Sequence, residues 1–163
     1  MIAQTRPILA FALGDAAGIG SELAARMISD TRVKEAARLL VVGDRRQLEQ
    51  GAAQARLALD IPDWDPDREQ DVALVERRNI AAGDVITGQG DAITGGAALD
   101  NFASALRICA AGAAQAACFT PFNKHSMRLA NPSYVDEIGF IQSVLGTDAE
   151  GAEFNVLDEI WNA

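Results

Sequence analysis

Short apolar runs that stop at a glycine recur in the first third of the chain. Residues 7–13 form one such run, which ends at Gly14, and residues 39–42 form another, which ends at Gly43. Runs of this length and composition are typical of strands that are buried on both faces, as in parallel sheets. The pattern therefore predicts two core strands early in the chain.

Helical spacing follows each of these two runs. Apolar residues recur at helical intervals after Ser21, which can cap a helix there, and a further helical turn opens at Asp30 or Thr31. A polar helix is expected from Arg45 to about Ala58. The order strand, helix, strand, helix indicates an α/β fold with a mostly parallel sheet, flanking helices and right-handed crossovers.

The second half of the chain continues the alternation. A brief strand is expected over Val72–Val75, and Gly83–Gly96 reads as a glycine-rich loop before a long helix. In that helix Leu99, Phe102, Leu106 and Cys109 form an apolar stripe, with Asp100, Asn101, Ser104 and Arg107 off it. The elements expected after this helix are a buried, central strand over 115–119, a turn over 120–123, and helices over 123–129 and about 135–145. We expect no internal domain boundary within residues 1–163, even at the acidic, proline-containing connection over 60–70.

Composition and charge narrow the functional classes. Of the 163 residues 49% are hydrophobic and 23% charged, which fits a globular domain. Lys and Arg total 14 against 23 Asp and Glu, so the formal charge is −9 and no basic patch is available for nucleic acid. The alanine-rich stretch over 103–119 is too short and too polar to span a bilayer, and no leader is recognisable, so a cytoplasmic protein is expected.

The cysteines and the histidine offer little metal chemistry. Cys109 and Cys118 have no CxxC spacing and are expected to be small core residues. His125 is the only histidine, so a site with two or three histidine ligands cannot be built from one copy of the chain.

The glycine-containing turn over residues 14–20 is a candidate anion site. Backbone amides between a strand and a helix can face a phosphate, and Asp15, Gly18 and Gly20 would shape such a cleft. The turn is neither a GxGxxG nor a Walker A motif, and a tight strand-to-helix turn needs glycine for backbone reasons alone. Both interpretations stay open.

A second candidate lies after the strand over 115–119. Lys124 could neutralise a phosphate or carboxylate at the carboxyl end of that strand, where open α/β sheets bind ligands, although a lysine there is often simply solvated. His125 is more often exposed than catalytic. Asp136 and Glu137 are adjacent on a short helix and point about 100° apart, so a solvated helix start is their ordinary interpretation.

Three segments together resemble a known family. They are Ala12-Leu13-Gly14-Asp15-Ala16-Ala17-Gly18-Ile19-Gly20-Ser21-Glu22, Val41-Val42-Gly43-Asp44 and Phe119-Thr120-Pro121-Phe122-Asn123-Lys124. In this order and spacing they resemble the amino-terminal half of the 4-hydroxythreonine-4-phosphate dehydrogenases of vitamin B6 synthesis. The resemblance implies an isocitrate/isopropylmalate dehydrogenase-like fold and a homodimer. It also implies oxidation of a small phosphorylated hydroxy acid with NAD and a divalent metal, with related members acting on other four-carbon phosphorylated acids or on a dihydrodiol dicarboxylate.

The resemblance also suggests which residues meet the substrate. Lys124 would hold a substrate anion, with Asn123 beside it in the cleft. Family members have proline where Ala16 and Ser21 stand, and a Gly-His-Thr-Glu segment whose histidine and threonine contact substrate; Glu137 and Ile138 occupy those two places here. A carboxylate there repels an anionic substrate unless a metal or a lysine intervenes, which predicts a different substrate preference.

Length is the largest departure from the family. Its members are about twice as long, and their metal-binding histidines lie in the part that would follow Ala163. The chain is therefore expected to be the amino-terminal half of such an enzyme, with neither NAD nor metal bound fully by this chain alone, and to associate with itself or with a carboxyl-terminal half. The alternative is a non-catalytic module that acts in association or structure.

Overall fold

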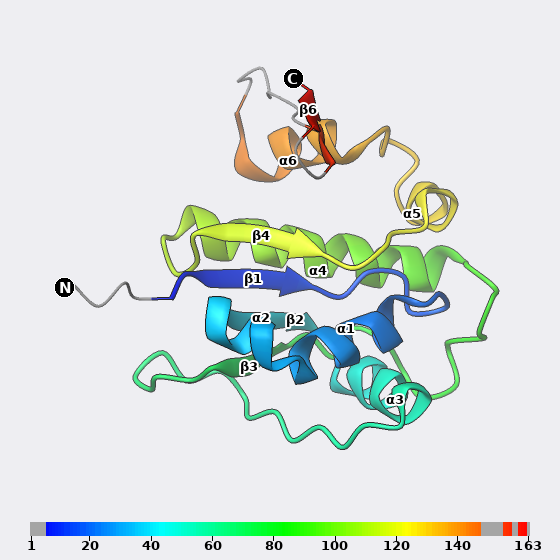
Figure 1. Ribbon diagram of the computed structural model, residues 1–163. Helices are drawn as coiled ribbons and strands as arrows, with labels where there is room; N and C mark the ends of the chain where they lie inside the picture. Colours follow the sequence, from blue (N-terminus) through cyan, green and yellow to red (C-terminus); the bar gives the residue numbers. More distant parts are fainter. Residues whose placement is uncertain (1–5, 148–154, 158–159, 163) are drawn as a thin grey trace.

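Four parallel strands form the centre of the molecule. A computed structural model of the protein describes residues 6–147, 155–157 and 160–162, the last two ranges as backbone only. The strands β1 (Ile8–Ala12), β2 (Arg38–Gly43), β3 (Val72–Glu76) and β4 (Ala116–Phe119) lie in the order β3-β2-β1-β4 (Figure 1). All three neighbouring pairs are parallel, which confirms the predicted α/β class.

The strand β4 does not lie where the sequence places it. It is an edge strand of the described sheet, not a central one, and it is only partly buried, with the Phe119 side chain 42% exposed. An apolar run predicts that a strand has apolar neighbours, but it does not say which strand pairs with which. The expectation of a buried central strand was therefore wrong in both respects.

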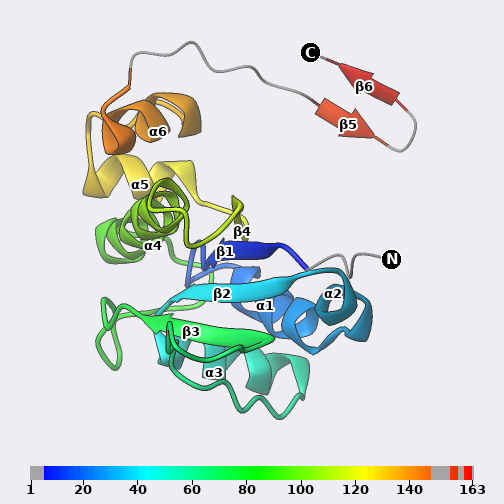
Figure 2. The same cartoon turned by 90° about the vertical axis from the view of Figure 1, so that its left-hand side faces the viewer.

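Alternate residues of β1 pack against different helices. Phe11 lies in one core cluster with Ala24 and Ile28 of α1 (Gly20–Ser29) and with Leu48 of α3 (Arg45–Ala55). Ala10 and Ala12 face the other side and pack on Ala105 of α4 (Ala92–Ala110). Because successive side chains of a strand point to opposite faces, helices cover both faces of the sheet. Figure 2 shows these elements from a second direction.

Helix α4 (Ala92–Ala110) is longer than expected at its amino end. Asp91 accepts a hydrogen bond from the Thr94 N–H, and Thr94 Oγ1 accepts one from the Asp91 N–H, which together form a capping box. Gly95 and Gly96, predicted to be loop, therefore lie inside the helix. Asn101 and Ser104, predicted to lie on its polar side, are buried because α4 packs on the sheet on one side and on α5 and α6 on the other.

The remaining elements mostly follow the expected ranges. Helix α1 begins without a side-chain cap, so Ser21 is not the cap that its position suggested; it lies buried in the first turn. Helix α2 (Thr31–Ala36) is capped by Asp30, one of the two residues at which a helical turn was expected to open. Helix α3 ends at Ala55, before the predicted end at about Ala58, because Arg56 adopts a left-handed conformation.

Beyond β4 the chain forms two short helices and a hairpin. Helix α5 (Lys124–Ala130) is capped by Asn123, and α6 (Glu137–Leu145) by Asp136. Both helices contact α4, and β5 (Asn155–Leu157) pairs antiparallel with β6 (Ile160–Asn162). Cys109 and Cys118 are partly buried free thiols that pack against core clusters. No helix in the described ranges combines the length and apolar character needed to cross a membrane.

Candidate functional site

The turn after β1 is pressed against the segment that follows β4. The Gly14 N–H donates to Thr120 Oγ1 at 2.7 Å, and the Asp15 N–H donates to the Pro121 carbonyl at 3.1 Å. A Cβ on Gly14 would lie 2.4 Å from the Pro121 oxygen, and one on Gly20 would lie 2.8 Å from Thr120 Oγ1. Glycine is required at these two positions because the chain's own backbone and side chain approach them closely.

Gly18 is not constrained in this way. A Cβ there would lie 3.4 Å from Asp15 Oδ2, an ordinary contact. The Asp15 carboxylate is buried in the turn and accepts a hydrogen bond from the Ala17 N–H at 3.0 Å. Within the turn the Ala17 N–H is therefore already bonded to the Asp15 carboxylate. Anion binding at this turn remains a prediction.

Buried amides hold the end of β1 in place. The Gln47 side chain donates to the Gly14 carbonyl at 3.0 Å, and the Asn101 side chain donates to the Leu13 carbonyl at 2.9 Å. Asn79 in turn donates to Asn101 Oδ1 at 2.9 Å. These residues were not predicted from the sequence, because the direction in which an amide side chain points depends on how the neighbouring elements pack.

An ion pair between Asp100 and Arg77 is hydrogen-bonded to this amide network through Asn79. Asp100 accepts hydrogen bonds from Arg77 and Asn79. Burial of Asp100 by itself raises its pKa, but the hydrogen bonds from Arg77 and Asn79 and the charge of Arg77 outweigh burial, so its pKa lies below the ordinary value. Asp100 is therefore a charged residue that supports the turn, not a free acid or base.

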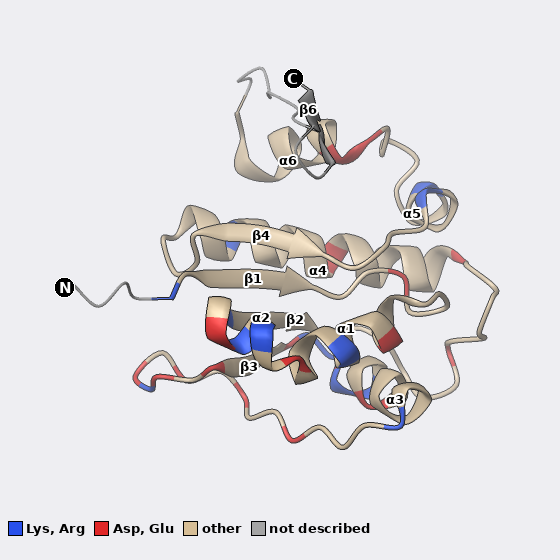
Figure 3. Ribbon diagram, viewed as in Figure 1, with Lys and Arg blue, Asp and Glu red and all other residues tan. Residues whose placement is uncertain are grey.

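Lys124 and Glu137 are brought together. The Lys124 Nζ lies 2.9 Å from Glu137 Oε2, with the lysine side chain 52% exposed and the glutamate side chain 25% exposed. Each residue opens its helix, so the pair joins the start of α5 to the start of α6. Figure 3 shows a basic segment on α5 and an acidic segment at the start of α6. The sequence predicted both residues for the site, but not that they contact one another.

Glu137 also interacts with the Tyr134 side chain. Tyr134 is 3% exposed, and its hydroxyl makes no hydrogen bond of good geometry in the described part of the molecule. Burial, and then the Glu137 carboxylate, raise the pKa of Tyr134. Burial also raises the pKa of Glu137, but the Lys124 ammonium, a backbone hydrogen bond and the Tyr134 hydroxyl together outweigh burial and hold that pKa below the ordinary value.

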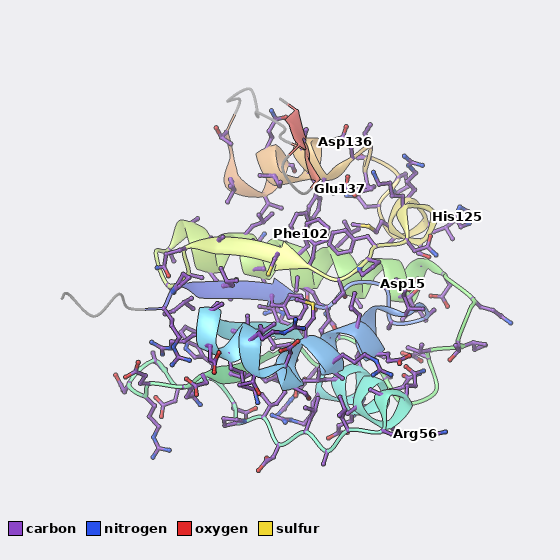
Figure 4. The ribbon with its side chains drawn as sticks, viewed as in Figure 1. Asp15, Arg56, Phe102, His125, Asp136 and Glu137 are labelled. Carbon is purple, nitrogen blue, oxygen red and sulfur yellow. The ribbon has the colours of Figure 1, made fainter. Side chains whose placement is uncertain are left out.

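The other predicted residues are spread along the carboxyl edge of the sheet. Asn123 accepts hydrogen bonds from the N–H groups of His125 and Ser126, so capping of α5 accounts for it. His125 is exposed, and Ile138 is 38% exposed. Figure 4 shows Asp15 and His125 beyond the ends of the strands and Glu137 at the start of α6. No hydrogen bond or ion pair within the described ranges joins Asp15 or Gly18 to Lys124 or Glu137.

The chain matches a known protein family. Residues 35–162 match the family described as pyridoxal phosphate biosynthetic protein PdxA.

Individual relatives agree with this match. A candidate 4-hydroxythreonine-4-phosphate dehydrogenase of Rhizobium meliloti is 40% identical over 98% of this chain and 47% of its own length. A similarly named protein of Pseudomonas aeruginosa is 33% identical over 100% of this chain and 50% of its own. The chain thus spans about half the length of the curated relatives it matches.

Solved structures share the fold. The crystal structure of a 4-hydroxythreonine-4-phosphate dehydrogenase from Burkholderia phymatum superposes with a TM-score of 0.84 at 23% identity, over 97% of this chain and 49% of that one. One from Klebsiella pneumoniae gives a TM-score of 0.77 at 18% identity, over 99% of this chain and 50% of that one.

Proposed function

The chain belongs to the PdxA family of pyridoxal phosphate biosynthetic proteins, and from this membership we propose that a protein containing it is a dehydrogenase of phosphorylated hydroxy acids. The proposal rests on the family match and on relatives named for 4-hydroxythreonine-4-phosphate. The substrate is 4-hydroxythreonine-4-phosphate or a related four-carbon phosphorylated acid. The working unit is a cytoplasmic homodimer, within which residues 1–163 form the amino-terminal half.

Within this reaction we assign to the chain the binding of the substrate. Lys124 stands after the carboxyl end of a parallel strand, where α/β sheets bind their ligands, and its ammonium is exposed enough to meet a substrate anion. Glu137 limits which anion does so, and Ile138 offers a partly exposed apolar side chain next to it. Asp15, Gly18 and Gly20 lie in the turn after the neighbouring strand β1, and Asn123 caps the helix that Lys124 opens.

The described residues do not fit the metal and the nucleotide on their own. They contain no group of three His, Cys, Asp or Glu side chains placed to hold a metal ion. The faces of Gly14 and Gly20, which could admit a phosphate, are filled by Thr120 and Pro121. When bound, NAD would accept hydride and a divalent metal would polarise the hydroxyl group. We assign no step through either group to this chain, and place their sites on the half that the relatives carry in addition.

We propose that this second half pairs with the open edge of β4. The β4 edge of the described sheet is unpaired, Phe119 is exposed there, and no residue of α6 is buried. An open edge beside apolar surface is a position where another chain segment adds to a sheet.

The proposal is tested by assembling the two halves. The chain would be produced together with the second half of the Rhizobium meliloti relative and given NAD, a divalent metal and 4-hydroxythreonine-4-phosphate or threonate 4-phosphate. We expect NADH formation that depends on both halves and falls at least tenfold in Lys124→Ala, because the substrate anion then loses its counter-charge. The matched control is Lys34→Ala, which removes the chain's other lysine.

The outcomes separate the alternatives. Equal activity of the Lys124→Ala and wild-type assemblies would remove Lys124 from the site. An assembled complex without turnover on either substrate would favour the non-catalytic module.

A further inference from the structure

Lys124 already has an anion beside it in the ligand-free protein. The Glu137 carboxylate holds its ammonium at 2.9 Å, and this is the one ion pair between α5 and α6 in the described ranges. The neighbouring Asp136 is engaged differently, because its carboxylate accepts the Gly139 N–H at 2.8 Å as the cap of α6. Two adjacent carboxylates therefore have separate tasks, and only Glu137 neutralises the lysine.

The surroundings favour keeping Glu137 in this position. Its carboxylate pairs with the Lys124 ammonium and also interacts with the buried Tyr134 hydroxyl, which has no well-formed hydrogen bond among the described residues. The aromatic ring of Phe140 stacks on that of Phe102 at a centroid distance of 5.6 Å and meets the ring of Tyr134 at 6.0 Å. The start of α6 is thus positioned by ring packing as well as by charge.

We propose that Glu137 is an internal competitor that occupies the place at Lys124 which an anionic ligand would take, and so determines specificity at this position. This inference rests on the proposed function for the class of ligand, a phosphate- or carboxylate-bearing small molecule. A ligand anion reaches Lys124 only by displacing Glu137, and a neutral ligand group leaves the pair intact. Anions that cannot replace all the contacts of Glu137 are rejected.

The test uses inorganic phosphate and the chain as it exists. Phosphate is titrated at constant ionic strength, and binding is followed by nuclear magnetic resonance through the backbone amides of Lys124 and His125. Glu137→Gln keeps the shape of the side chain and removes its charge, and we expect it to bind phosphate about two- to fivefold more tightly, the range for a partly exposed ion pair. The double variant Lys124→Ala/Glu137→Gln is expected to lose this gain.

Asp136→Asn is the matched control, because it removes one neighbouring charge while asparagine still caps a helix. We expect its phosphate affinity to stay at the wild-type value. An equal gain in Asp136→Asn, no gain in Glu137→Gln, or a gain that persists without Lys124 would each overturn the proposal. If Glu137→Gln does not fold, Lys124→Ala alone decides: unchanged phosphate binding at these amides contradicts the role of the lysine. Since no NAD or turnover is involved, failure here is distinct from failure of the dehydrogenase proposal.

Discussion

Gly14 and Gly18 stand in the same turn, but their surroundings differ. Gly14 is closed in by the Thr120 and Pro121 carbonyls, whereas the nearest neighbour of Gly18 is the end of a side chain. We expect Gly14→Ala to lower the free energy of unfolding by about 1–3 kcal/mol, because the added methyl group displaces backbone. Gly18→Ala serves as the control and should change it by less than about 0.5 kcal/mol. Urea denaturation measures both, and equal losses would contradict the packing explanation.

Asn101 provides a second prediction for a single residue. It is fully buried and donates to the Leu13 carbonyl, so Asn101→Ala leaves that carbonyl without its partner. The expected loss in unfolding free energy is about 1–3 kcal/mol. Ser104→Ala, one turn further along the same helix, should cost clearly less. A similar cost for both would mean that cavity formation, and not the hydrogen bond, explains the loss.

Single residues also show what the sequence can and cannot predict. Lys124 and Glu137 were both recognisable as candidates, but their contact depends on how α5 and α6 pack, which no local pattern encodes. Asn101 was placed on the polar side because helical periodicity assumes one buried face, and α4 has two. Asp30 and Asp91 illustrate the opposite case, since both cap helices through local hydrogen bonds. A helix start at Asp30 or Thr31 was expected, whereas the start at Asp91 was not.

At the level of elements, the capping box should determine where α4 begins. Asp91→Ala removes the acceptor for the Thr94 N–H and is expected to cost about 0.5–2 kcal/mol of unfolding free energy. Asp91→Asn keeps an acceptor and should recover most of this loss. Thermal or urea unfolding of the two variants decides, and a full loss in Asp91→Asn would show that charge matters more than capping.

The contact between α5 and α6 should depend on pH. The pKa of Glu137 in the folded state lies below its ordinary value of 4.5, so the carboxylate stabilises the fold above that pH and this contribution disappears as the pH falls through the folded-state pKa. We expect the difference in unfolding free energy between wild type and Glu137→Gln to shrink on acidification from neutral pH to below 4.5. Denaturation curves at several pH values measure it. A difference that is constant over this window would contradict the assignment.

The positions of the elements along the chain were predicted better than the way in which the elements pair and pack. The strands β1 to β3 and the helix α2 lie close to their expected ranges, because apolar runs and local caps encode them. The place of β4 was wrong, since an edge strand and a central strand share the same apolar composition. Its partial exposure became visible only when pairing was known.

For the molecule as a whole, the open edge of β4 makes a prediction about assembly. The Thr120 N–H donates to the Ala12 carbonyl, and because alternate residues of a strand bond the same neighbour, the Ala117 N–H faces the open side. Ala117→Pro should leave the chain folded but weaken its association with the second half of a relative at least tenfold. Ala117→Ser retains the N–H and serves as the control. Analytical ultracentrifugation measures association, and unchanged binding of Ala117→Pro would place the partner elsewhere.

The pairing of β1 with two very different partners also has a consequence for how the protein folds. The strand β2 follows β1 closely in the chain, whereas Ile8 meets Gln115 across 107 residues. During synthesis the Phe11 side can condense with α1, β2 and α3 as soon as they leave the ribosome, while the Ala10 side waits for α4 and β4. Closure of that long loop should limit the folding rate, and the nascent chain exposes an alanine-lined sheet face until α4 packs on it.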